Sequence, residues 1–127
     1  MREFRCIVFT ETEALNAIIN FRRKSHIQLP VGTVASVVYT TANEAVTTKI
    51  NLLDDHNVPS DMIIDAVEMA AALVSYCLDR KIPMSKMYDK KIELMEGQIT
   101  LVLTMIIDMK KNMKQQTQPK RTAPGPA

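Results

Sequence analysis

The chain has 127 residues, of which 46% are apolar and 24% are charged, and this composition is ordinary for a soluble globular domain. Its two cysteines, Cys6 and Cys77, are too few for a disulfide framework, so we expect both to be buried thiols in a reducing, cytoplasmic environment. The apolar stretches are too short to cross a membrane, and acidic residues interrupt the N-terminal apolar run. We therefore expect neither a membrane span nor a signal peptide.

The net charge of +2 comes from one end of the chain. Residues 110–127 contain no acidic residue, whereas the segment 1–109 is mildly acidic. A basic tail on an acidic domain argues against a globally basic surface for nucleic-acid binding. We expect the tail to be flexible and disordered alone, because it contains prolines and has no apolar pattern. Its basic residues are Lys110, Lys111, Lys114, Lys120 and Arg121.

The first half of the chain predicts a strand, a helix and a hairpin. Residues 3–9 are rich in aromatic and β-branched residues, which is typical of a strand. A helix is expected from 10 to about 25, because its apolar residues recur at helical spacing. Residues 33–40 and 45–53 predict two further strands around a turn at 41–44, and apolar and polar residues alternate through the second of them.

The second half predicts the same elements again after a polar connector. Residues 61–64 predict a short strand, and residues 65–80 predict a helix in which three consecutive alanines give a high helix propensity. Residues 90–95 and 98–105 predict a hairpin. Gly97 stands at the turn position that requires a positive φ, which fixes the place of the hairpin turn.

The two halves resemble each other at an offset of 55 residues. When residues 6–29 are placed over residues 61–84, most apolar positions coincide. The expected helix starts coincide as well, because Thr10 and Asp65 are both N-cap residues and each is followed three residues later by a glutamate. We interpret the chain as one supersecondary unit used twice.

The predicted fold is therefore α+β. We expect a two-layer sandwich built from a tandem β-α-β-β repeat, with about six mainly antiparallel strands in one sheet and two helices on one face of it. The copies span 3–53 and 58–107 within a single domain of residues 1–109, and the basic tail follows. Neither copy buries enough apolar area to fold alone, so the two are expected to share one core.

No cluster of residues in the sequence predicts an enzyme. His26 and His56 lack a Cys, His or Asp at zinc-ligand spacing, and Cys77 lies among apolar residues on a helix, so we expect no metal and no reactive thiol. The run Asp-Asp-His at 54–56 is better explained as a polar loop than as a metal or acid–base site. Three glycines cannot build a phosphate-binding loop, and we expect no cofactor.

Basic residues close both predicted helices. One explanation is structural, because cations favour the negative end of the helix dipole and its free carbonyl groups. The alternative is an anion site, in which two cationic helix ends lie side by side and hold a nucleotide or a nucleic acid, with Lys90 and Lys91 near by. The residues that would form this site are Arg22, Arg23, Lys24, His26, Arg80 and Lys81, together with the basic tail.

The sequence thus favours a small, non-enzymatic cytoplasmic protein that acts by binding other proteins, as a homo-oligomer. The sheet face without helices is expected to carry Val37 or Val38, and Val102, which a second subunit would cover. Nine methionines, six of them at or after Met84, predict either an adaptable docking surface or the filling of an irregular core. Binding of an anionic ligand is the alternative function, and the sequence identifies no particular partner.

Overall fold

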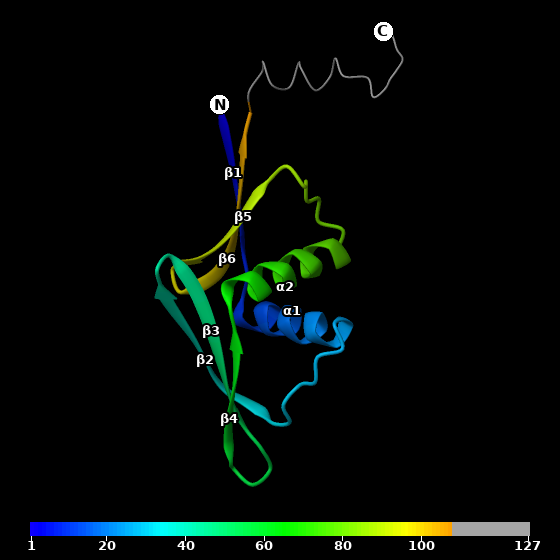
Figure 1. Ribbon diagram of the computed structural model, residues 1–127, viewed down its shortest axis with the longest axis vertical. Helices are drawn as coiled ribbons and strands as arrows, with labels where there is room; N and C mark the ends of the chain where they lie inside the picture. Colours follow the sequence, from blue (N-terminus) through cyan, green and yellow to red (C-terminus); the bar gives the residue numbers. More distant parts are fainter. Residues whose placement is uncertain (108–127) are drawn as a thin grey trace.

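The computed structural model describes residues 1–107, and Figure 1 shows their course. The predicted α+β class is confirmed, with six antiparallel strands and two helices among these residues. The predicted basic tail at 110–127 lies outside the described residues. In chain order the elements are β1 (Arg2–Val8), α1 (Glu11–Lys24), β2 (Thr33–Ala42), β3 (Ala45–Leu53), β4 (Pro59–Ile64), α2 (Ala66–Asp79), β5 (Asp89–Met95) and β6 (Gln98–Ile106).

The strands form two sheets, where the sequence predicted a single one. One sheet has the order β1-β6-β5 and the other has the order β2-β3-β4, and all neighbours are antiparallel. Each sheet therefore combines the hairpin of one half of the chain with the first strand of the other half. This reciprocal exchange ties the two halves together, because neither half contains a complete sheet of its own.

The two helices lie side by side, on the same side of both sheets (Figure 1). α2 contacts β3 in one sheet and β5 in the other, so the helix pair bridges the sheets and closes one core. Burial of each large aliphatic side chain stabilises the fold by roughly 1.5–3 kcal/mol. The core side chains with almost no exposure come from both helices and both sheets: Ile18, Ile50, Ile64, Met69, Leu73, Ile99, Leu101 and Leu103.

Both hairpins have two-residue turns in which the central residues adopt positive φ. Asn43 and Glu44 have φ of 52° and 64°, and Glu96 and Gly97 have φ of 53° and 79°. Turns of this handedness match the twist of the flanking strands, and they fix the strand register because they leave no slack between the strands. The fixed register keeps the apolar residues of these alternating strands on the side of the helices.

The two helices begin and end at positions 55 residues apart. Thr10 caps α1 in a reciprocal box, in which the Glu13 amide donates to the Thr10 hydroxyl (3.1 Å) and the Thr10 amide donates to the Glu13 carboxylate (2.9 Å). Asp65 caps α2 by accepting from the Glu68 amide (2.8 Å). Beyond the last turns, His26 and Lys81 both adopt left-handed φ, 57° and 59°. Descent of the halves from one ancestral unit stays a prediction.

The cysteines differ from the expectation that both are buried. Cys77 is fully buried on α2, but Cys6 is exposed on β1. Cys6 pairs with Val102 in the β1–β6 ladder and lies on the face of the sheet that carries no helix. The strand pattern was correct here, but the side of the strand that faces the core depends on the sheet that β1 joins, which the sequence did not reveal.

Candidate functional site

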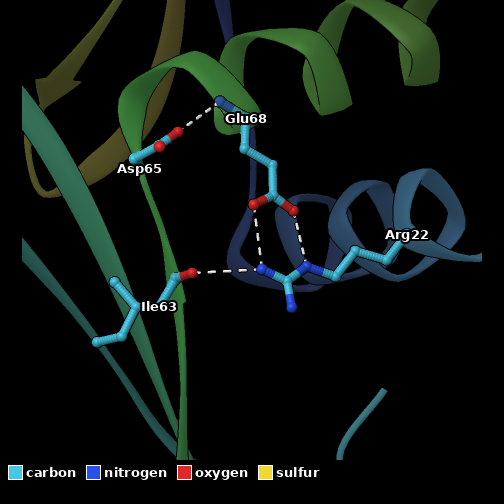
Figure 2. A network of polar contacts seen from close by, with 4 residues as sticks. All are labelled: Arg22, Ile63, Asp65 and Glu68. Atoms are coloured by element: carbon cyan, nitrogen blue, oxygen red, sulfur yellow. Dashed lines mark hydrogen bonds and ion pairs between the residues drawn. The ribbon is translucent and has the colours of Figure 1, made fainter. Parts of the chain in front are cut away.

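Arg22 joins the two helices through an ion pair (Figure 2). Its Nε donates to Glu68 Oε2 (2.7 Å) and its Nη2 donates to Glu68 Oε1 (3.0 Å), so the guanidinium and the carboxylate meet in a two-armed geometry. The same Nη2 also donates to the backbone oxygen of Ile63 at the end of β4 (3.3 Å). The side chains are only 15% and 20% exposed, so this contact fixes how α1 meets the first turn of α2.

Lys24 makes the second ion pair between the helices. Its ammonium group contacts Asp79 in the last turn of α2 and donates to the hydroxyl of Ser75 (3.3 Å). Lys24 and Asp79 therefore mark the ends of two parallel helices that finish side by side. Two of the residues predicted for an anion site, Arg22 and Lys24, are thus engaged with carboxylates of α2.

The other basic residues of the predicted site are distributed around that shared end. Arg23 is exposed in the last turn of α1, His26 is exposed just beyond α1, and Lys81 is exposed just beyond α2. The Arg80 guanidinium lies over the ring of Tyr76, 3.4 Å from its centroid, which holds it against the protein surface. Within residues 1–107, none of these four takes part in an ion pair. The tail residues Lys110, Lys111, Lys114, Lys120 and Arg121 lie outside the described residues.

Lys90 and Lys91 lie on β5. Lys90 donates to the backbone oxygen of Tyr88 (3.1 Å) and borders a groove beside α2, whereas Lys91 contacts Glu93 on its own strand (3.7 Å). The structure therefore brings the ends of the two helices together through Lys24 and Asp79, and Lys90 lines a groove that reaches Asp79 at the end of α2.

α2 presents an apolar surface to solvent that the sequence analysis did not single out. Val67 is 80% exposed and Leu78 is 55% exposed, and an open groove of about 450 Å³ runs between this side of the helix and Lys90. The signal was present in the composition, because α2 has only two charged residues among 14, so a large part of its surface is apolar. We call this surface the α2 stripe, and it consists of Val67, Ala70, Ala71, Val74 and Leu78.

The corresponding surface of α1 is only partly polar, because the apolar Leu15 and Ile19 stand at the positions of Ala70 and Val74. Thr12, Asn16 and Arg23 stand on α1 at the positions that correspond, 55 residues earlier, to the first, third and last residues of the α2 stripe. All three are exposed. The two helices have the same length, so apolar residues at the first, third and last positions of the α2 stripe are not a requirement of this helix position in the fold.

The sheet faces without helices carry separate apolar side chains. On the β1-β6-β5 sheet, Phe4, Val8 and Ile106 are exposed, but Val102 is only 8% exposed, contrary to the expectation that it lies open for a second subunit. On the β2-β3-β4 sheet, Val38 is exposed, in agreement with the prediction that either Val37 or Val38 lies on the helix-free face. Val37 instead packs against the core, because it lies on the opposite side of the same strand.

The predicted methionine surface is divided. Met62 and Met69 are buried in the core, and Met84 packs against it, so these side chains fill space between the helices and the sheets. Met87 is exposed in the connection before β5. Met109 and Met113 lie outside the described residues. Filling of the core thus accounts for part of the set, and Met95 and Met105 are half-buried on β5 and β6.

The chemical groups in the described part of the chain are engaged in structural contacts. The Asp54 carboxylate accepts from the backbone amides of His56 (2.8 Å) and Val58 (2.9 Å), which makes the Asp-Asp-His run an ordered turn. Burial raises the pKa of the Cys77 thiol, against the opposing effects of Arg5 and Arg80. Within residues 1–107, no three His, Cys, Asp or Glu side chains come together in a group that could hold a metal ion.

Compared with known proteins, the chain matches no family model, no curated protein and no solved structure. Neither of the helices in the described residues is long and apolar enough to cross a membrane. Function is therefore inferred from the surfaces of the molecule, and the α2 stripe is an apolar helix surface with exposed Val67 and Leu78.

Proposed function

We propose that the protein is a small, non-enzymatic cytosolic adaptor that works as a homo-oligomer and binds other proteins. The observation that carries this proposal is the α2 stripe. Both acidic residues of α2, Glu68 and Asp79, are paired with basic residues of α1, and Asp79 lies at one end of the groove beside the stripe. A largely apolar helix surface whose neighbouring acidic residues are already paired is the kind of surface that protein partners cover.

The shape of the α2 stripe supports a helical partner. The small side chains of Ala70 and Ala71 lie between the larger Val67 and Leu78, so a neighbouring helix could approach closely in the middle and pack at both ends. Lys90 borders the groove and would favour an acidic residue next to the apolar anchors of the partner. In many complexes an amphipathic helix is recognised in this way, with its apolar side in a hydrophobic groove and its polar side in solvent.

The experiment is a reciprocal exchange between the two helices. The first variant places the α1 residues on α2, as Val67→Thr, Ala71→Asn and Leu78→Arg. Partners captured by the wild-type chain from its source cell should be lost with this variant, while circular dichroism and thermal unfolding stay close to wild type. The proposal is wrong if the captured proteins are the same.

The control variant carries the opposite exchange on α1, as Thr12→Val, Asn16→Ala and Arg23→Leu. It changes the same number of exposed helix positions but leaves the α2 stripe intact, and it should retain the partners. Loss of the partners with both variants would indicate a general effect of altering the helix surfaces, which would contradict a specific role of α2.

Binding of an anionic ligand is the second candidate function. Its support is that the parallel helices bring Arg23, His26, Arg80 and Lys81 to one end of the helix pair, next to the Lys24–Asp79 contact. It ranks second because Arg22 and Lys24 are paired with carboxylates. Fluorescence anisotropy with labelled RNA and with a labelled nucleotide tests it, since affinity should fall with salt and with the double substitution Arg23→Ala and Lys81→Ala.

A further inference from the structure

The two sheets have four edge strands, and three of them carry charged residues. β1 and β5 are the edges of one sheet, and β2 and β4 are the edges of the other. β1 has arginines and a glutamate, β5 has lysines and acidic residues, and the short β4 has Pro59 and Asp61. Charges and prolines on an edge discourage pairing with a further strand. β2 has neither charges nor prolines, and the register shift in its ladder with β3 lies between Val34 and Ser36, near its N-terminal end.

β2 is also the longest strand in the described residues and one of the most exposed. It spans Thr33–Ala42, and most of its residues are β-branched. Residues along an edge strand direct their backbone N–H and C=O groups alternately toward the neighbouring strand and away from it. Apart from the ladder with β3, no backbone hydrogen bond within residues 1–107 involves a residue of β2. Its outward backbone groups therefore remain open to a further strand.

We infer that β2 pairs with β2 of a second copy of this chain, antiparallel about a two-fold axis at Val38. The pairing would join the two β2-β3-β4 sheets into one continuous six-stranded sheet across the dimer. On the side of the helices, Val37 would face the partner's Tyr39, which is a favourable aromatic and β-branched pair. On the other side, Ser36 would face the partner's Thr40, and Val38 would face its own copy.

A second copy fits this edge better than an unrelated strand does. A two-fold interface must be complementary to itself, and a strand without charges meets this condition in antiparallel pairing because it brings no like charges together. β2 itself contains no charged residue that would select a foreign partner by electrostatic attraction, and the nearest carboxylate affecting it is Glu11 beside Tyr39. This inference deepens the homo-oligomeric part of the proposed function, and it does not depend on the α2 stripe.

The structure supplies a matched pair of test positions. Val38 on β2 and Ile63 on β4 are both cross-strand partners of Lys49 on the central strand, and they are 46% and 54% exposed. Val38→Glu and Ile63→Glu therefore place the same carboxylate beside the same lysine, on the same face of the sheet. The two variants differ in that only Val38→Glu puts two carboxylates opposite each other at the proposed two-fold axis.

Sedimentation equilibrium of the full chain over a range of micromolar concentrations measures the outcome. We expect a reversible dimer for the wild type and for Ile63→Glu. We expect a dissociation constant raised about tenfold or more for Val38→Glu, because like charges directly opposite each other destabilise strand pairs. A wild type that stays monomeric, or a Val38→Glu variant that dimerises like the wild type, would overturn the inference.

Hydrogen exchange of the wild-type chain gives a second readout that needs no substitution. Backbone amides of β2 should become more protected as protein concentration rises, while those of the edge strand β4 should not change. Unchanged β2 protection in a dimeric sample would show that the interface lies elsewhere. A dimer that is lost with the α2 exchange variant and kept with Val38→Glu would also overturn this inference, but it would leave the proposed role of α2 intact.

Discussion

Arg22 on α1 and Glu68 on α2 stand 46 residues apart in the chain and meet through two hydrogen bonds of 2.7 and 3.0 Å. The guanidinium adds a third bond to the end of β4 through the backbone oxygen of Ile63. One side chain therefore connects both helices to the strand that enters the second helix.

Removal of this connection should destabilise the protein. We expect Arg22→Ala to lower the free energy of unfolding by about 1–3 kcal/mol, because the partly buried Glu68 carboxylate loses its partner. Urea unfolding measures the change. Lys24→Ala is the matched control, since the Lys24–Asp79 pair is about half exposed and a pair of this kind contributes about 0–1 kcal/mol. If both variants lost the same free energy of unfolding, the partly buried, two-armed Arg22–Glu68 pair would have no special role in stability.

The cap of α1 offers a prediction about helix stability. Thr10→Ala removes the acceptor of the Glu13 amide and should lower the free energy of unfolding by about 0.5–2 kcal/mol. Thr12→Ala, within the first turn of the same helix, removes an exposed threonine without a capping role and should change stability much less. Thermal unfolding of both variants under the same conditions gives the comparison, and a larger effect of Thr12→Ala would refute the assigned role.

Gly32 and Gly97 are predicted to respond differently to substitution. Gly32 has φ of 152°, and a Cβ placed there would lie 2.9 Å from the backbone oxygen of Leu53, so Gly32→Ala must displace β3 or the incoming loop. We expect a loss of about 1–3 kcal/mol. Gly97 has φ of 79° with nothing near its Cβ position, and Gly97→Asn should be nearly neutral because asparagine tolerates that turn conformation. Chemical denaturation of the two variants tests the difference.

The two cysteines should differ in reactivity toward a thiol reagent such as dithionitrobenzoate. Cys6 is exposed on the outer face of β1 and should react quickly in the folded protein. Cys77 is fully buried on α2, so its modification should require unfolding and should follow the unfolding rate in urea. Rapid modification of both thiols in the native protein would show that the α2 core opens easily.

The buried Cys77 thiol should make the stability of the fold depend on pH in alkaline solution. Burial raises its pKa above the ordinary value of 9.0, so the folded protein retains a proton that the unfolded chain releases in alkaline solution. The contribution of this thiol to the free energy of unfolding is therefore fully present below pH 9.0, and it decreases as the pH rises above that value. Cys77→Ala should flatten this alkaline decrease in urea unfolding, and a variant with the wild-type slope would exclude Cys77 as its source.

The elements of the fold were predictable because their signals are local. The strand at 45–53 was bounded correctly by its alternation, and the hairpin turn was located by Gly97, whose conformation restricts the choice of residue. The helix starts followed from Thr10 and Asp65, because a cap and the amide that it satisfies are only three residues apart. Each of these features is decided by neighbours in the chain.

The partners of the elements were not predictable from the same signals. Alternation in β1 specifies that one side is buried, but not that β1 joins β6 rather than its own hairpin. For the same reason, the sequence did not predict that Arg22 pairs with Glu68. The position of Glu68 in the first turn of α2 was already explained by the helix dipole, so no partner for it was sought. The α2 stripe was missed because three consecutive alanines at 70–72 were interpreted as helix propensity, and propensity does not reveal which side of a helix is covered.

The exchange of first strands between the sheets has a consequence for biosynthesis. β1 is synthesised before β6, yet the two strands pair, and the pairing of Arg2 with Ile106 joins residues more than a hundred positions apart. On the ribosome, β1 must wait without its partner until β6 has emerged. Long-range pairing of this kind slows folding and leaves apolar strand surface exposed for longer. We therefore expect the nascent chain to depend on chaperones until β6 is available for pairing.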